Sequence, residues 1–140
     1  MTPETLFLLL RLSFFALLYL GLGLIALIVW REIRAPAGAA PSAWLVLAQG
    51  PADLRPGTQF AVRAETVIGR APGSTILLPD TFVSARHARI VWRDGRWWIE
   101  DLGSTNGTFV DEQPVTRAVP LHPGATVRVG QTVLTFAVSA

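Results

Sequence analysis

The sequence predicts an all-β sandwich that is preceded by a single transmembrane α-helix. Between Leu12 and Trp30 there are nineteen residues without a charge, which is enough helix to cross the apolar core of a bilayer. From Ala43 onward, short runs rich in β-branched and aromatic residues alternate with turn signals, and no helical period appears. We therefore divide the chain into a transmembrane helix at residues 6–30, a juxtamembrane linker at 31–42 and a β domain at 43–140.

The composition excludes several kinds of site before any motif is considered. The chain has no cysteine, so disulfides, thiolate zinc sites and cysteine nucleophiles are excluded. Its two histidines and its scattered acidic residues form no metal-binding pattern, and we expect no metal and no cofactor. The formal net charge is only +2, which is not the charge excess of a nucleic-acid-binding protein. Any anion binding must therefore come from the local placement of a few arginines.

The apolar segment has the flanks of a membrane span. Arg11 lies near one end, where its long stem can carry the guanidinium to the interface, and Trp30 lies at the other end, followed by Arg31 and Arg34. A signal peptide is the alternative, since small residues follow at 35–40, but this apolar run is longer than the core of a typical signal peptide. Arg31 and Arg34 favour a cytoplasmic carboxyl side, opposed by Arg11. We expect a single-pass protein of the cell membrane with a cytoplasmic C-terminal domain.

The residues after the span predict a short tether and then a series of strands. Ala35 to Ser42 combine alanine, proline and glycine without an apolar period, which predicts a tether that buries nothing. The clearest hairpin is Arg93 to Arg96, because Asp-Gly supplies the positive φ angles of a tight turn. Trp97 and Trp98 must face opposite sides of a strand, so at least one belongs to the core. Strands are expected at residues 43–48, 59–64, 65–69, 74–78, 87–92, 96–101, 125–130 and 131–138.

Three of the predicted loops contain groups that suit a phosphate and the peptide that carries it. Gly69-Arg70 ends one strand, Ser84-Ala85-Arg86-His87 precedes another, and Gly103-Ser104-Thr105-Asn106-Gly107 forms a turn. An arginine, two hydroxyls and an amide are typical ligands of phosphate oxygens and of a peptide main chain. Each loop alone is a weak signal, because glycine and asparagine are common in ordinary turns.

In this order and spacing, the loops resemble the forkhead-associated domain, a phosphothreonine-binding β-sandwich. The resemblance covers residues 43–138 and rests on the Gly-Arg of VIGR, the Leu-Pro-Asp of ILLPD, the Ser-x-x-His of VSARHA, and DLGSTNGTFV. It implies eleven strands in two sheets, with the ligand held by loops at one end. It further implies that Arg70 and Ser84 bind the phosphate, that Thr105 adds a phosphate contact and that Asn106 holds the ligand main chain. Three further positions, which shape the site, are Gly69, His87 and Gly107.

One position departs from the family pattern. The residue after the motif serine is commonly lysine, arginine or asparagine in the family and contacts the ligand, whereas here it is Ala85. Arg86, one place later, either takes over this contact or points elsewhere. We expect the affinity to be somewhat reduced and not abolished, since one charge-assisted hydrogen bond contributes about 1.5–3 kcal/mol.

Three other interpretations compete with this one. A serine hydrolase would need a nucleophile elbow and a second plausible base beside Ser84 and His87, and the sequence has neither. A nucleic-acid surface is suggested by the arginines near residues 86–96, but Asp94, Glu100 and Asp101 lie close by and indicate an ordinary solvated face. A forkhead-associated domain that docks proteins without a phosphate remains open.

The sequence thus predicts a non-catalytic, membrane-anchored adaptor. It would recruit phosphothreonine-bearing substrates of a serine/threonine kinase to the membrane and would not bind nucleic acid. The layout of one span, a short tether and one forkhead-associated domain resembles bacterial proteins associated with serine/threonine kinase signalling and with cell-wall growth and division.

Overall fold

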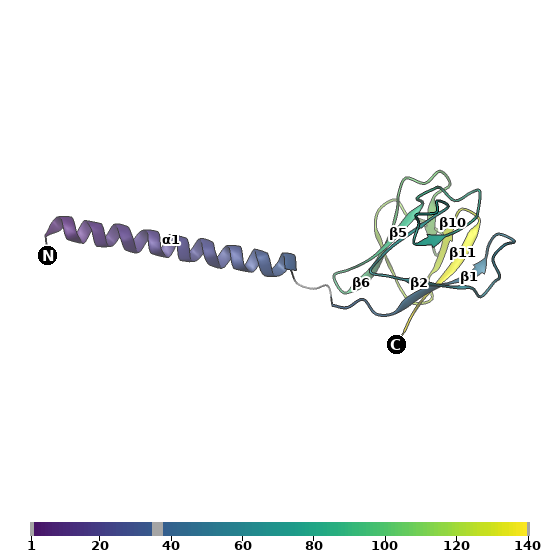
Figure 1. The fold of residues 1–140 in the computed structure, drawn as a ribbon, viewed down its shortest axis with the longest axis horizontal. Helices are drawn as coiled ribbons and strands as arrows, with labels where there is room; N and C mark the ends of the chain where they lie inside the picture. The colour runs from purple at the N-terminus through teal and green to yellow at the C-terminus, as the bar shows by residue number, and fades with distance from the viewer. Residues whose placement is uncertain (1, 35–37, 140) are drawn as a thin grey trace. The chain divides into compact units, whose positions relative to one another are not determined.

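The computed structural model describes residues 2–34 and 38–139, which form two separate compact units, Met1–Pro36 and Ala37–Ala140. The first unit is the helix α1 (Pro3–Arg34), and the second contains all the strands (Figure 1). Ala35 to Ala37 of the predicted tether lie outside the described residues.

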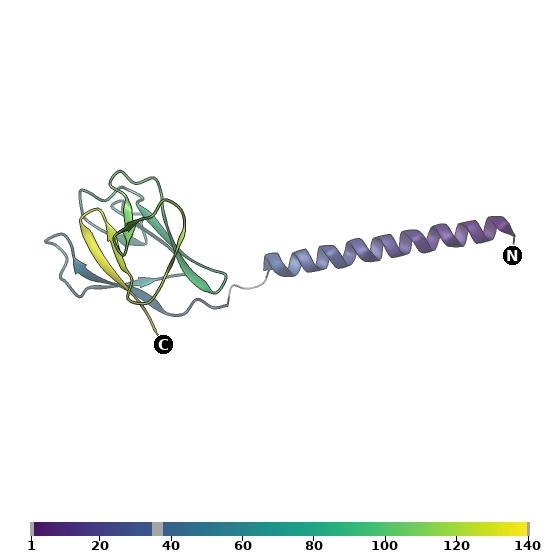
Figure 2. The same cartoon turned by 180° about the vertical axis from the view of Figure 1, so that it is seen from behind.

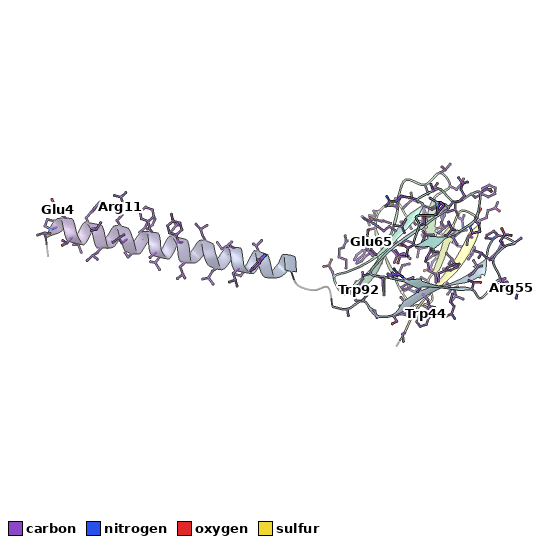
Figure 3. The ribbon with its side chains drawn as sticks, viewed as in Figure 1. Glu4, Arg11, Trp44, Arg55, Glu65 and Trp92 are labelled. Carbon is purple, nitrogen blue, oxygen red and sulfur yellow. The ribbon has the colours of Figure 1, made fainter. Side chains whose placement is uncertain are left out.

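The helix α1 begins at Pro3 because proline fits the first helical position, where its missing N–H is not needed. Its residues 3–30 are long and apolar enough to cross a membrane, and the large apolar side chains of this segment are exposed. Figure 3 shows the charged Glu4 and Arg11 near its beginning. The helix also continues to Arg34, so residues 31–34, which we expected in the linker, are helical. Arginine and glutamate are good helix formers, and a charged flank therefore does not end a helix.

The second unit is a two-sheet β-sandwich, as predicted. One sheet has six strands in the order β2-β1-β11-β10-β7-β8, and the other has five in the order β4-β3-β5-β6-β9. Figures 1 and 2 both show β11, in yellow, beside the blue β1. The strands are β1 (Ala43–Gln49), β2 (Gln59–Val62), β3 (Glu65–Gly69), β4 (Ile76–Leu77), β5 (Ala88–Arg93), β6 (Arg96–Asp101), β7 (Thr108–Val110), β8 (Gln113–Pro114), β9 (Val119–Leu121), β10 (Thr126–Val129) and β11 (Thr132–Val138).

The core lies between the sheets, because alternate residues of each strand point inward. Leu45 of β1, Ile90 of β5 and Phe136 of β11 are all completely buried, while their neighbours along the strand are partly exposed. Of the adjacent tryptophans, Trp97 is in the core and Trp98 is half-buried. Burial of these apolar side chains is the main term that stabilises the sandwich.

The described residues contain the eleven strands that the family resemblance implied, three more than the residue pattern alone indicated. The three additional strands, β7, β8 and β9, have only two or three residues each, too few to show an alternating pattern. The Asp-Gly hairpin is confirmed: Arg93 pairs with Arg96, and the φ angles of Asp94 and Gly95 are 54° and 71°.

The tether does not remain unpacked up to residue 42, contrary to our expectation. The carbonyl of Gly38 accepts a hydrogen bond of 2.7 Å from the indole of Trp92, a residue labelled in Figure 3. Ala40 packs against the core, and Ser42 accepts a hydrogen bond of 2.8 Å from the main chain of Ser139. Small residues such as alanine can lie close to a sheet edge, so a segment without an apolar period still packs here.

Candidate functional site

The loop of Ser84 is fixed to the end of β3 by main-chain hydrogen bonds. Arg70 N donates to Ser84 O at 3.0 Å, and Ala71 N donates to Ala85 O at 3.1 Å. On the other side, His87 N donates to Ile68 O at 2.8 Å. The structure therefore joins two of the three predicted loops side by side, and their relative position is set by the backbone.

Gly69 is required by this close approach. A Cβ at position 69 would lie 2.1 Å from Ala85 O and 2.7 Å from Ser74 Oγ, so no larger side chain fits without moving the backbone. Ser74 Oγ itself donates to Ala85 O at 3.2 Å, which adds the β3–β4 loop to the same cluster. The glycine of the Gly-Arg pair thus positions the serine loop, and the arginine projects from it.

The ring of His87 lies beneath the loops and joins two of them. The residue is completely buried, and its Nδ1 accepts a hydrogen bond of 3.0 Å from Ser84 N. Because Nδ1 accepts, the ring proton lies on Nε2, which donates to Gly107 O at 2.9 Å. Both ring nitrogens are therefore used in holding the Ser84 loop against the 103–107 loop, as expected for a structural histidine.

The Ser84 hydroxyl is not paired with this histidine. Its Oγ accepts a hydrogen bond of 3.1 Å from Thr105 N, and within residues 2–34 and 38–139 its own proton has no acceptor. A general base must reach the proton that it removes, and the His87 nitrogens are already occupied. The Ser84 proton is instead available to an oxygen of a ligand.

The loop of Thr105 and Asn106 is held by one carboxylate, Asp101 at the end of β6. Its two oxygens accept hydrogen bonds from the main chain of Gly103 and Ser104 and from the hydroxyls of Ser104 and Thr108, at 2.5–3.0 Å. Partial burial, the largest single effect, raises the pKa of Asp101, but the hydrogen bonds from the Ser104 and Thr108 hydroxyls and from the Ser104 main chain lower it, and the net result is a pKa below the usual value. Our interpretation of Asp101 as part of a solvated face was wrong, because an acid beside a turn gives no sequence signal of the donors that fold around it.

A second carboxylate, Asp80, fixes the residues just before Ser84. It is buried, and it accepts hydrogen bonds from Phe82 N at 2.8 Å, Gln131 N at 3.1 Å and the hydroxyl of Thr132 at 3.0 Å. Since Thr132 begins β11 of the other sheet and Gln131 immediately precedes it, Asp80 connects the loop to both layers of the sandwich. The Leu-Pro-Asp motif contained this residue, but only the fold shows what it binds.

Arg70 and Asn106 meet at the main chain of residues 82 and 83. Arg70 Nε donates to Val83 O at 3.1 Å, and Asn106 Nδ2 donates to Phe82 O at 2.8 Å. Both side chains are otherwise exposed, and Arg70 forms no ion pair with any described residue. The structure thus places Arg70, Ser84, Thr105 and Asn106 at one end of the sandwich. Together they present a guanidinium, a hydroxyl donor and an amide, which suit a phosphate ester and its peptide.

Arg86 lies apart from this cluster. It lines a neighbouring hollow of about 320 Å³ together with Val67, Ala71, Gly73 and Ser74. Its exposed side chain has no hydrogen bond or ion pair with any residue that the structure describes. The structure therefore favours the second of the two alternatives that we left open for Arg86, in which it points away from the groups around Ser84.

Two of the other arginines near this region have acidic partners. Arg89 forms ion pairs with Glu100 and Glu65, and Arg93 forms one with Asp94. The hydrogen bond and charge of Glu100 raise the pKa of Arg89 above its usual value. These ion pairs neutralise positive charge that would otherwise attract the phosphates of a nucleic acid. They are typical of a solvent-exposed protein face.

Comparison with known proteins gives one consistent result. The family model described as "FHA domain" matches residues 66–130. Over 79 residues the chain is 49% identical to the FHA domain-containing protein FhaB of Mycolicibacterium smegmatis, covering 56% of this chain and 51% of that protein. It is 39% identical over 106 residues to the oxoglutarate dehydrogenase inhibitor of Corynebacterium diphtheriae, covering 75% of this chain and 69% of that protein. The chain thus spans about half the length of FhaB and over two thirds of the second relative.

A solved structure is also similar. It comes from a structural and functional study of phosphothreonine-dependent FHA domain interactions, and it is 33% identical to this chain with a TM-score of 0.62. The aligned region is 98% of that structure and 71% of this chain. A match of nearly the whole of that domain confirms the fold that the sequence motifs predicted.

Proposed function

The chain belongs to the forkhead-associated family of phosphothreonine-binding adaptors, and we propose that it binds phosphothreonine proteins through Arg70, Ser84, Thr105 and Asn106. The observation that carries this proposal is the hydrogen bonding of the Ser84 hydroxyl. Its oxygen is oriented by Thr105 N, its proton has no acceptor among the described residues, and the guanidinium of Arg70 binds the carbonyl of the preceding residue, Val83. A phosphate oxygen is the acceptor that best satisfies both donors.

In this proposal the loops are preorganised, which means that they already have the binding conformation before the ligand arrives. His87, Asp80 and Asp101 hold the three segments in place with hydrogen bonds, so little loop ordering remains to oppose binding. Asn106 would exchange its bond to the Phe82 carbonyl for one to the ligand main chain. Thr105 contributes through its main-chain N–H, which orients Ser84, and its exposed side chain can contact the phosphate.

We further propose that α1 anchors the domain in the cell membrane with the sandwich in the cytoplasm. The length and apolar surface of α1 support the anchor, and Arg31 and Arg34 support the orientation. A kinase that uses ATP makes the ligand, which requires the same side of the membrane. The chain would then recruit kinase substrates to the membrane, and its layout supports a role in bacterial cell-wall growth or division.

The position of the site within the sandwich suits such a tether. The candidate loops lie beside Gly130, in the turn just before β11, where a Cβ would be 2.8 Å from the main chain of Phe82. The tether enters beside Ser139, just past the other end of β11. A seven-residue strand spans about 20 Å, so the attachment and the site are at opposite ends of the sandwich.

The direct test is binding of one peptide in two forms, with phosphothreonine and with threonine. A clear preference for the phosphorylated form supports the proposal. Equal binding would instead support the alternative of phosphate-independent docking, which the alanine at position 85 keeps open.

A further inference from the structure

The hollow around Arg86 differs in character from the Ser84 cluster. Its five lining residues, Val67, Ala71, Gly73, Ser74 and Arg86, include no acid. The Ser74 hydroxyl already donates to Ala85 O, so it leaves only its oxygen as an acceptor. The donors that remain are the guanidinium of Arg86 and the main-chain N–H of Gly73, neither of which has a partner among the described residues. A small hollow with free donors and no acid suits an anionic group.

The backbone fixes how far this hollow lies from the phosphate cluster. Arg86 is two residues after Ser84, so their Cα atoms are at most about 7 Å apart. The intervening Ala85 is held by hydrogen bonds of 3.1 and 3.2 Å from Ala71 and Ser74, which belong to the wall of the hollow. One extended peptide advances about 3.3 Å per residue. A ligand that has its phosphothreonine at Ser84 and runs toward the hollow would therefore bring a residue one to three positions away within reach of Arg86.

We propose that Arg86 selects ligands with a second anionic group close to the phosphothreonine, either an acidic side chain or a second phosphorylated residue. This inference rests on the proposed phosphothreonine site. It assigns Arg86 a contact that is separate from the phosphate held by Arg70 and Ser84. Alanine at position 85 favours this arrangement, because its methyl group is too small to stand between the two anions of the ligand.

The experiment uses the full chain in detergent micelles and alanine-rich peptides with one central phosphothreonine. Glutamate, glutamine or a second phosphothreonine is placed at one position at a time, up to three residues on either side. Wild-type protein should bind the glutamate peptide about threefold to tenfold more tightly than the glutamine peptide at the favoured position, as expected for an exposed charge-assisted contact. The doubly phosphorylated peptide should bind at least as tightly as the glutamate peptide.

Two variants separate the specific contact from net charge. Arg86→Gln should lose the preference for the second anion and keep the preference for phosphothreonine over threonine. Arg63→Gln is the matched control. Like Arg86, Arg63 is exposed, and its side chain has no partner among the described residues. It precedes β3, whereas Arg70 follows β3, so it lies at the strand end away from the candidate site. It should keep both preferences.

Each outcome bears on one proposal. A wild-type protein without a preference for the second anion, or an Arg86→Gln protein that retains it, would overturn the role of Arg86. Loss of the preference in Arg63→Gln as well would show a long-range charge effect and also contradict that role. A wild-type protein that binds threonine and phosphothreonine peptides equally would reject the proposed function itself, which makes the two failures distinguishable.

Discussion

The Nδ1 of His87 accepts a hydrogen bond of 3.0 Å from the main-chain N–H of Ser84, so this histidine is joined to the backbone of the serine and not to its hydroxyl. The opposite nitrogen donates to the carbonyl of Gly107. The ring thus holds two loops together and leaves the Ser84 proton for a ligand. The arrangement is that of a binding site with a structural histidine, and it lacks the nucleophile-to-base contact of a hydrolase.

His87→Ala should mainly reduce stability. The change leaves a gap in the core and removes the partners of Ser84 N and Gly107 O, so we expect a loss of about 1–3 kcal/mol in the free energy of unfolding. Binding should weaken only because the loops are less well held. Thermal unfolding, followed by tryptophan fluorescence, measures the first effect and peptide titration the second. A His87→Ala protein as stable as wild type, with undiminished affinity, would contradict the structural role.

Gly69→Ala should disturb the site through the backbone. The added methyl would lie 2.1 Å from Ala85 O, so the Ser84 loop must move away from β3. We expect a loss of stability of about 1–3 kcal/mol, typical of overpacking, together with weaker phosphopeptide binding. Gly38→Ala is the control, since a Cβ there meets nothing within 4 Å and Gly38 lies outside the proposed binding site. If both variants had the same melting temperature and affinity, the close approach at Gly69 would not matter for the site.

The stability of the sandwich should depend on pH through Asp101. Its pKa is lower in the folded protein than its usual value of 3.8: partial burial raises it, but the hydrogen bonds from the Ser104 and Thr108 hydroxyls and the Ser104 main chain contribute to a net lowering. A carboxyl group whose pKa is lower in the folded state than in the unfolded state stabilises the fold at every pH above the unfolded-state pKa. This stabilisation is lost as the pH falls through the folded-state pKa. Melting temperatures from pH 6 down to pH 2.5 should therefore fall less steeply in Asp101→Asn, which is less stable at pH 6. Identical slopes in the two proteins would contradict this assignment.

Anchoring by α1 predicts where the protein is found. The full chain should remain in the membrane fraction after a high-salt wash, because apolar contact with lipid does not depend on ionic strength, and a reporter fused after Ala140 should be active in the cytoplasm. Release of the chain by salt would reject the anchor. A reporter that works only outside the cytoplasm would reject the orientation.

The sequence predicted the sandwich because the alternation of buried and exposed residues is a local property of each strand. Long strands such as β5 and β11 show it, whereas β7 to β9 are too short and are specified by pairing with distant residues. The same distinction applies to the tether, where the packing of Gly38 depends on Trp92, fifty-four positions later.

The motifs indicated which residues gather at the candidate site but not how they are held. Asp80 and Asp101 each bind donors that are brought to them by the fold, so neither could be distinguished from a surface acid by spacing. Arg86 is only two positions after Ser84 in the sequence, yet it lines a different hollow because the chain bends there. Side-chain direction in a bent loop depends on backbone angles, and the residue pattern does not contain them.

The most direct test of the account is the affinity of the full chain for one peptide with phosphothreonine and with threonine, measured for wild type and for Arg70→Ala. Wild type should prefer the phosphorylated peptide at least tenfold, a difference of about 1.4 kcal/mol. Arg70→Ala should lose most of this preference and keep nearly the wild-type melting temperature, because the Arg70 side chain is exposed and its only hydrogen bond to a residue that the structure describes is the one to Val83 O. Equal affinity of wild type for the two peptides, or an unchanged preference in Arg70→Ala, would contradict the proposed site.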